Sequence, residues 1–161
     1  MLKKVFAGML AAVFTVMLAG CSGYKMTEKD MALQRSIKGF WVPDASTGYN
    51  SYDENGSLTE FLVVEFTDDF LYFIHECNMA SGYIETYDPI RYSFKNENFK
   101  VDVDGVASYA KVNFSDDRKT MKWITDAQTD TYNRISEEEA RALGIPEYNK
   151  EAWASGGGNA D

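Results

Sequence analysis

The amino-acid sequence predicts an all-β protein, an up-and-down antiparallel β-barrel of eight to nine strands with a short C-terminal helix packed outside. Nine short segments of strand-like composition follow one another at regular spacing, with no crossover helix between them. A sheet of this length leaves exposed edges unless it closes, so a closed barrel is favoured over an open sheet. The expected strands are 36–42, 58–67, 70–77, 82–87, 90–95, 99–103, 106–114, 120–126 and 129–135.

The hairpin at 99–114 specifies its own register. Asp104-Gly105 is a two-residue type I′ turn signal, because both central positions need a positive φ that Asp and Gly tolerate. This loop places six side chains on one face of the ribbon, because side chains alternate with period two. The expected pairs are Val103 with Val106, Val101 with Ser108 and Phe99 with Ala110.

Two-residue loops are also expected at Asp68-Asp69, Asp88-Pro89 and Ala127-Gln128. The first would pair Phe66 with Leu71, Val64 with Phe73 and Leu62 with His75. The second would place Tyr83, Glu85 and Tyr87 on the same face as Ile90, Tyr92 and Phe94. The third would place Met121, Trp123, Tyr132 and Arg134 on one face.

The first twenty residues have the features of a secretion signal. Two lysines at positions 3 and 4 precede an apolar stretch, 5–19, that is too short to span a membrane with ordinary flanks. The stretch ends in Leu18-Ala19-Gly20-Cys21, which resembles the lipobox of bacterial lipoproteins. The resemblance implies cleavage before Cys21 and a diacylglycerol on its sulfur, and Ser22 resembles an outer-membrane sorting signal. The alternative is an ordinary secretory signal followed by a chance cysteine.

Charge and cysteine content narrow the class of protein. Removing residues 1–20 removes two lysines and no acid, which takes the formal charge from −9 to −11. An acidic protein is a poor candidate for binding nucleic acid, or for binding the headgroups of anionic lipids electrostatically. Acylation of Cys21 would leave Cys77 as the only thiol, so no intramolecular disulfide is expected.

The segments that flank the strands complete the expected organisation. Residues 21–35 are read as a lipidated tether and a short helical turn at 30–35, capped by Thr27 or Asp30. The long polar loop at 44–57 is either a lid or simply mobile. Ser136 and Glu139 form a capping box, and the helix that they begin is expected to end at Gly144 and to lie over Phe70, Tyr72 and Ile74. Residues 36–144 are the barrel with this helix, and 145–161 are a flexible tail.

At Gly39-Phe40-Trp41 the chain resembles the lipocalin family, and more closely the bacterial lipocalin-like lipoproteins. The resemblance runs from about residue 30 to 144 and implies a G-x-W motif in the first strand and an arginine in the last. Arg134 in Thr131-Tyr132-Asn133-Arg134-Ile135 matches that arginine. A guanidinium over the Trp41 indole would gain roughly 1–2 kcal/mol and close the floor of the barrel.

The inward faces supply the candidate ligand-binding residues. Two interpretations stay open, because these side chains either line a cavity or fill the interior. Glu85 stands out, since a buried carboxylate is costly unless it is paired. It would hold the polar head of a ligand or bond tyrosine hydroxyls and Arg134, unless the register is off by one residue. The candidate lining residues are Leu62, Val64, Phe66, Phe73, Glu85, Tyr92, Phe94, Phe99, Val101 and Trp123.

His75 and Cys77 are the candidate metal-binding or catalytic residues. Strand alternation places them on one face as H-x-C, two ligands that do not make a metal site without others. A core histidine and a buried thiol are favoured, and no third group completes a nucleophilic pair. The acidic turns at 53–55 and 68–69 lack the spacing of a calcium loop.

These observations predict an envelope-anchored lipoprotein that binds or carries a small hydrophobic or amphipathic ligand in its barrel. The alternative is a protein-interaction or inhibitor module with a filled barrel and an envelope protein as its partner. Neither interpretation is enzymatic, and no catalytic residue, metal, cofactor or nucleic-acid partner is expected. The membrane is reached through the acyl anchor at Cys21. The expected location is the cell envelope and, if the cell is Gram-negative, the periplasmic face or the surface of the outer membrane.

Overall fold

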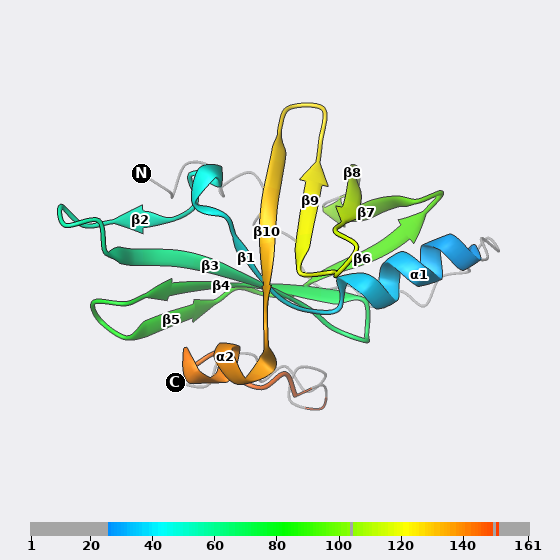
Figure 1. Cartoon of the computed structure of the whole chain (residues 1–161). Coiled ribbons are helices and arrows are strands. Elements are labelled where there is room, and N and C mark those ends of the chain that lie inside the picture. Colours follow the sequence, from blue (N-terminus) through cyan, green and yellow to red (C-terminus); the bar gives the residue numbers. More distant parts are fainter. Residues whose placement is uncertain (1–25, 104, 150, 152–161) are drawn as a thin grey trace.

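The computed structural model describes residues 26–103, 105–149 and 151. The expected signal peptide, the Cys21 anchor, Asp104 of the predicted turn and residues 152–161 of the expected tail lie outside this part. Ten strands and two α-helices are described (Figure 1). The strands are β1 Gly39–Pro43, β2 Ser51–Tyr52, β3 Leu58–Phe66, β4 Leu71–Asn78, β5 Tyr83–Thr86, β6 Ile90–Lys95, β7 Asn98–Val103, β8 Val106–Phe114, β9 Thr120–Ile124 and β10 Thr129–Ile135.

Eight of these strands close an antiparallel barrel. Their order around the ring is β3-β1-β10-β9-β8-β7-β6-β4, and the pairing of β4 with β3 closes it. The extra strands β2 and β5 pair with β3 and β4 outside the ring, where the four strands project together (Figure 1). The predicted fold class is therefore confirmed. Only β2 was not expected, because it lies in the loop at 44–57, where a 3₁₀ turn at Ala45–Thr47 also forms.

The β7–β8 hairpin has the predicted register, with Phe99 opposite Ala110, Val101 opposite Ser108 and Val103 opposite Val106. The β9–β10 loop is longer than predicted. Tyr132 lies opposite Met121, two residues from the predicted pairing, because the backbone N–H of Thr125 closes a wider turn onto the carbonyl of Gln128. A shift of two residues preserves the faces, so the predicted inward set on these strands is kept.

The predicted register of β3 and β4 is wrong by one residue. Phe66 lies opposite Tyr72, and Val64 lies opposite Ile74. The loop has three residues instead of the predicted two. The third is Phe70, whose φ of +60° places it in the left-handed region. The slip inverts every side chain of β4. Tyr72 faces the interior, while Phe73 lies on the outer face against Tyr148, with ring centroids 5.2 Å apart.

The hairpin predicted at Asp88-Pro89 does not exist. Both β5 and β6 pair with β4, with Ile84 opposite Cys77 and Ile90 opposite Tyr72. The two strands therefore pair one after the other with successive parts of β4 and do not pair with each other. Pro89 lacks an N–H and interrupts the ladder between them. Glu85 pairs opposite Glu76 on the sheet face that continues the barrel wall. Because β5 lies outside the ring, Glu85 is exposed rather than buried.

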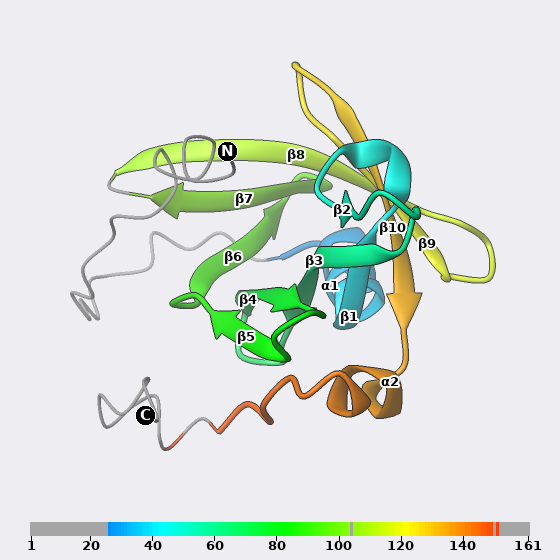
Figure 2. The same cartoon turned by 90° about the vertical axis from the view of Figure 1, so that its left-hand side faces the viewer.

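The first helix, α1 Glu28–Ile37, covers one end of the barrel (Figure 2). Thr27 and Asp30 cap it reciprocally, and it continues through Ile37, which was predicted to lie in the first strand. Ile37 is fully buried in the interior cluster. We call this the closed end, and the opposite end, where β9 and β10 are joined, the far end.

The second helix, α2 Glu137–Ala142, packs outside the barrel, and its Ser136–Glu139 capping box is confirmed. It covers the outward residues of β1, β3 and β4 rather than the expected Phe70, Tyr72 and Ile74 (Figure 2). Ile145, at the start of the expected tail, is buried in the same cluster. Within the described residues, neither helix has the length and apolar character needed to cross a membrane. The outer cluster is Phe40, Phe61, Val63, Cys77, Ala140 and Ile145.

Candidate functional site

Trp41 and Arg134 form the floor at the closed end. They lie opposite each other on β1 and β10, and the guanidinium carbon of Arg134 is 4.4 Å from the centroid of the indole. Trp41 is completely buried, and its Nε1 donates to the carbonyl oxygen of Ile37 at 2.7 Å. The first strand, the last strand and the end of α1 are thereby joined at one point.

Arg134 serves this floor rather than a ligand. One terminal nitrogen donates to the carbonyl of Ser36, at the end of α1. Desolvation lowers the pKa of the guanidinium, and the charge of Arg118 lowers it further. Gly39 begins β1 with a φ of +107°, and a Cβ there would lie 3.5 Å from Nη1 of Arg134. The glycine of the G-x-W motif thus meets a backbone requirement beside the guanidinium.

Above the floor, the interior is filled by aromatic rings. Phe99 lies at their centre, with its centroid 4.4 Å from Trp123, 5.2 Å from Tyr92 and 5.7 Å from Phe94. Phe66 packs edge-on against Phe99 at 6.0 Å. Phe66, Tyr92, Phe94 and Phe99 are all at most 3% exposed, so solvent is excluded from these four rings.

Toward the far end, the inward-facing side chains are only half-buried. Among the residues packed on the interior cluster, Tyr72, Ile90, Trp123 and Tyr132 keep part of their surface exposed. Burial raises the pKa of Tyr72 to about 12, so its phenol stays protonated at neutral pH. Within the described part of the chain, neither the Tyr72 nor the Tyr132 hydroxyl has a hydrogen-bond partner. Partly exposed apolar surface and free hydroxyls therefore face the same interior.

A buried carboxylate lies at the far end beside these rings. Asp130 on β10 is 7% exposed and shares the inward face with Trp123, its cross-strand neighbour. Its Oδ2 accepts from Nε2 of Gln128 at 2.7 Å and from the hydroxyl of Tyr49 at 3.4 Å. Burial raises the pKa of Tyr132, and the negative charge of Asp130 contributes to that shift. Tyr49 comes from the loop at 44–57, so this loop contributes to the far end.

The structure divides the sequence-predicted lining residues. Phe73 and Glu85 do not line the barrel, for the reasons of register and topology given above. Leu62 is buried on the same face of β3 as Val64 and Phe66. The predicted lining residues that do belong to the interior cluster are Val64, Phe66, Tyr92, Phe94, Phe99, Val101 and Trp123.

Tyr49 and Asp130 were not predicted as members of the site, and Tyr72 was predicted on the wrong face. Asp130 follows a loop whose true length moves it opposite Trp123. Alternation from Tyr132 already places Asp130 inward, and this signal could have been used. Tyr49 lies in a loop without periodicity, and no sequence signal places it.

The inward face continues from the barrel wall onto the projecting strands β3–β5, where it is acidic. Nδ2 of Asn78 donates to Oε1 of Glu60 at 3.0 Å, and the hydroxyl of Tyr87 donates to Oε2 of Glu76 at 2.7 Å. Glu85 lies opposite Glu76 on the same face. The approach to the far end along these strands therefore carries three carboxylates.

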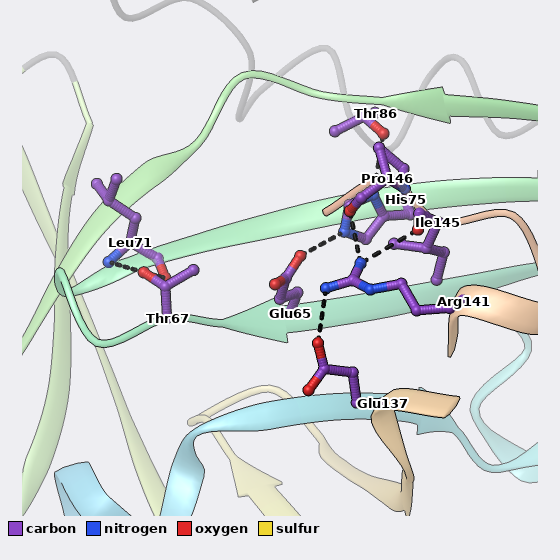
Figure 3. Close-up of polar contacts among 9 residues, drawn as sticks. All are labelled: Glu65, Thr67, Leu71, His75, Thr86, Glu137, Arg141, Ile145 and Pro146. Atoms are coloured by element: carbon purple, nitrogen blue, oxygen red, sulfur yellow. Dashed lines mark hydrogen bonds and ion pairs between the residues drawn. The ribbon is translucent and has the colours of Figure 1, made fainter. Parts of the chain in front are cut away.

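A second polar array lies on the outer face, beneath α2 (Figure 3). Nε2 of His75 lies 3.3 Å from Oε2 of Glu65, and its Nδ1 lies 2.9 Å from Oγ1 of Thr86. A hydroxyl, an imidazole and a carboxylate in a row can activate a nucleophile. Here His75 is only 1% exposed, so the row is closed to a substrate in this state. It joins β3, β4 and β5 side by side.

Arg141 holds the chain over this array. Its Nη1 donates to the carbonyls of Ile145 and Pro146 at 3.1 and 2.6 Å, and its Nη2 bonds Glu137 at 3.2 Å (Figure 3). The guanidinium carbon also lies 5.1 Å from the centroid of the Phe40 ring. These contacts turn the segment after α2 back onto β4. They explain why Ile145 is 2% exposed.

Cys77 on the outer face is expected to resist alkylation in the folded protein. It is 3% exposed, and burial, assisted by the charge of Glu76, raises the pKa of its thiol to about 11. The thiolate is the reactive form, so little is present at pH 8. Treatment with iodoacetamide at pH 8 followed by peptide mapping should leave Cys77 unmodified, and the same treatment in denaturant should label it. Rapid labelling without denaturant would contradict the packing described for α2.

The donor chemistry and the comparisons add two findings. Among the described residues, no three His, Cys, Asp or Glu side chains gather in a way that could hold a metal ion. Neither a scan against protein-family models nor a search of curated proteins finds a match to this chain.

Proposed function

We propose that the chain is an envelope lipoprotein that binds a small hydrophobic or amphipathic molecule in the far half of its barrel. The observation that carries the proposal is a set of half-buried inward side chains that pack on fully buried rings of the interior. Phe94 and Phe99 near the closed end are 1% exposed, while Tyr72, Trp123 and Tyr132 toward the far end keep exposed surface. Apolar walls with a few convergent polar groups are typical of small-molecule sites.

The proposal includes the lipocalin-like character of the barrel and its anchor. The Trp41–Arg134 floor and the helix that precedes β1 support the resemblance to lipocalins. The lipobox-like Leu18-Ala19-Gly20-Cys21 supports an acyl anchor and, with it, a place in the cell envelope. The proposed role is binding or carriage rather than catalysis.

The first test is native mass spectrometry of the full-length protein purified gently from the envelope of its own host. A reproducible added mass that organic extraction removes is the expected result, and it would identify the class of ligand. The extracted protein should then bind the neutral apolar probe N-phenyl-1-naphthylamine, with a rise in its fluorescence. Trp123→Ala should weaken the binding of the probe by about tenfold, because it removes much of the apolar wall in the far half of the barrel.

Tyr109→Ala is the matched control for Trp123→Ala. Tyr109 lies on β8, is 56% exposed and pairs with Lys100 on the outer face, so its loss should leave probe binding unchanged. Circular dichroism must show that both variants are folded. No added mass together with no probe binding would contradict the proposed function.

The second candidate function is a protein-interaction module, and exposed apolar side chains favour it. Tyr52 and Leu58 are cross-strand neighbours on β2 and β3, and Met79 and Tyr83 lie at the turn between β4 and β5. They are 37–61% exposed and lie on the projecting strands rather than on the barrel (Figure 1). A chain that binds no probe but loses a co-purifying envelope protein on Tyr83→Ser would support this candidate.

A further inference from the structure

The charge of Asp130 is buried without a cation beside it. The residue is 7% exposed, and its Oδ2 receives only the uncharged donors of Gln128 and Tyr49. In the described part of the chain, its Oδ1 accepts no hydrogen bond and is not among the fully buried unpartnered atoms, so it stays accessible. No Lys, Arg or His there pairs with the carboxylate. Burying a carboxylate is costly unless its charge is compensated, so a positively charged partner would be strongly favoured here.

The groups around Asp130 suit an organic cation better than a bare ion. Trp123 lies directly across the ladder, and Tyr132 follows two residues later on the same face. The hydroxyl of Tyr49 contacts the carboxylate itself. The faces of Trp and Tyr rings attract ammonium groups, and methylated ammonium groups are bound by such rings in proteins. A carboxylate flanked by three aromatic side chains combines charge compensation with that attraction.

We propose that the far end of the barrel binds an amphipathic organic cation, an amine or a quaternary ammonium group on an apolar tail. Asp130 is its counter-ion, Trp123 and Tyr132 contact the cationic head, and the tail enters among the inward apolar side chains. This inference rests on the proposed function, because it names the class of ligand for the same interior. It adds a specificity-determining residue that the barrel lining alone does not supply.

The path to the site has the matching charge. The inward positions of β2–β5 carry Glu60, Glu76 and Glu85, and within the described residues no Lys or Arg occupies an inward position on those strands. The inward guanidinium, Arg134, lies at the closed end on Trp41. Carboxylates along one wall raise the local concentration of a cation and speed its association, an effect that salt screens. The binding of an anionic ligand would be opposed by the same groups.

The test compares three probes of one chain length on the full-length protein by isothermal titration calorimetry. Decyltrimethylammonium, decanol and decanoate are titrated below their micellar concentrations. The expected order of affinity is cation, alcohol, carboxylate, with the cation bound about tenfold more tightly than the alcohol. Its affinity should fall as salt is raised, while that of decanol should not.

Asp130→Asn removes the charge and keeps the shape of the side chain. It should abolish the preference for the cation and leave the affinity for decanol within twofold of the wild-type value. Asp126→Asn is the matched control, since Asp126 lies in the same β9–β10 loop region, is exposed and carries the same charge. This control should bind all three probes as the wild-type protein does.

The outcomes separate this inference from the proposed function. Equal binding of the cation and the alcohol, or tighter binding of decanoate, would overturn the cation site and leave the apolar site standing. Binding of none of the three probes would overturn both. If Asp130→Asn weakened decanol as much as the cation, Asp130 would be a structural residue and not a counter-ion.

Discussion

Replacement of Trp41 by alanine is expected to lower the free energy of unfolding by about 3–5 kcal/mol, the usual range for deletion of a buried aromatic side chain. Trp41 is fully buried, so the change leaves a cavity in the floor. It also leaves the carbonyl of Ile37 without its donor and the guanidinium of Arg134 without the indole beneath it. Chemical denaturation followed by circular dichroism measures the loss.

Two further variants divide this effect. Trp41→Phe keeps a ring beneath Arg134 but loses the Nε1 hydrogen bond, so it should cost less, about 1–3 kcal/mol. Arg134→Met keeps much of the buried stem, and its cost reports the guanidinium alone. A loss below about 1 kcal/mol for Trp41→Ala would mean that Trp41 is not the floor of the barrel.

Where a turn used its usual residues, the local sequence was sufficient to predict the fold. The β7–β8 register follows from Asp104-Gly105, and the capping box at Ser136 and Glu139 begins α2 as predicted. The floor was expected from the resemblance to lipocalins, and closure of the barrel brings Trp41 and Arg134 together because they lie on its first and last strands. These features depend on neighbours in the chain or on closure itself.

The errors arose where the residues of a turn did not indicate the path that the chain takes. Phe70 occupies the left-handed region that Gly or Asn normally marks, so nothing in the sequence indicated a three-residue loop. That single residue inverted β4 and moved Phe73 from the expected lining to the outer face. At Asp88-Pro89, a typical turn dipeptide interrupts a strand line instead of reversing the chain.

The candidate site was only partly predictable, since it combines strands with a loop. The aromatic interior follows from alternation on β6, β7 and β9, and most of it was expected. The polar end depends on Tyr49, which comes from the irregular segment 44–57 and meets Asp130 only in the folded chain. The local sequence does not predict that contact, because Tyr49 and Asp130 lie far apart in the chain.

Phe99 is the central ring of the interior, and Phe99→Ala is expected to cost about 3–5 kcal/mol of unfolding free energy. The residue is 1% exposed, and its ring contacts those of Phe66, Tyr92, Phe94 and Trp123. Its loss therefore removes the packing between the filled half and the far-half wall. The same denaturation experiment measures the effect.

Tyr109→Ala in the same hairpin is the control, and it is expected to change the free energy of unfolding by no more than about 0.5 kcal/mol. Tyr109 is as aromatic as Phe99, but it points outward and is 56% exposed. A large cost at Tyr109 and a small one at Phe99 would contradict the inward face assigned to β7 and β8.

In a variant such as Phe99→Leu, which keeps apolar volume, the fold should persist while Trp123 loses its closest ring contact, at 4.4 Å. The free energy of probe binding in that variant should then fall by more than the free energy of unfolding, because the wall of the site depends on the orientation of Trp123.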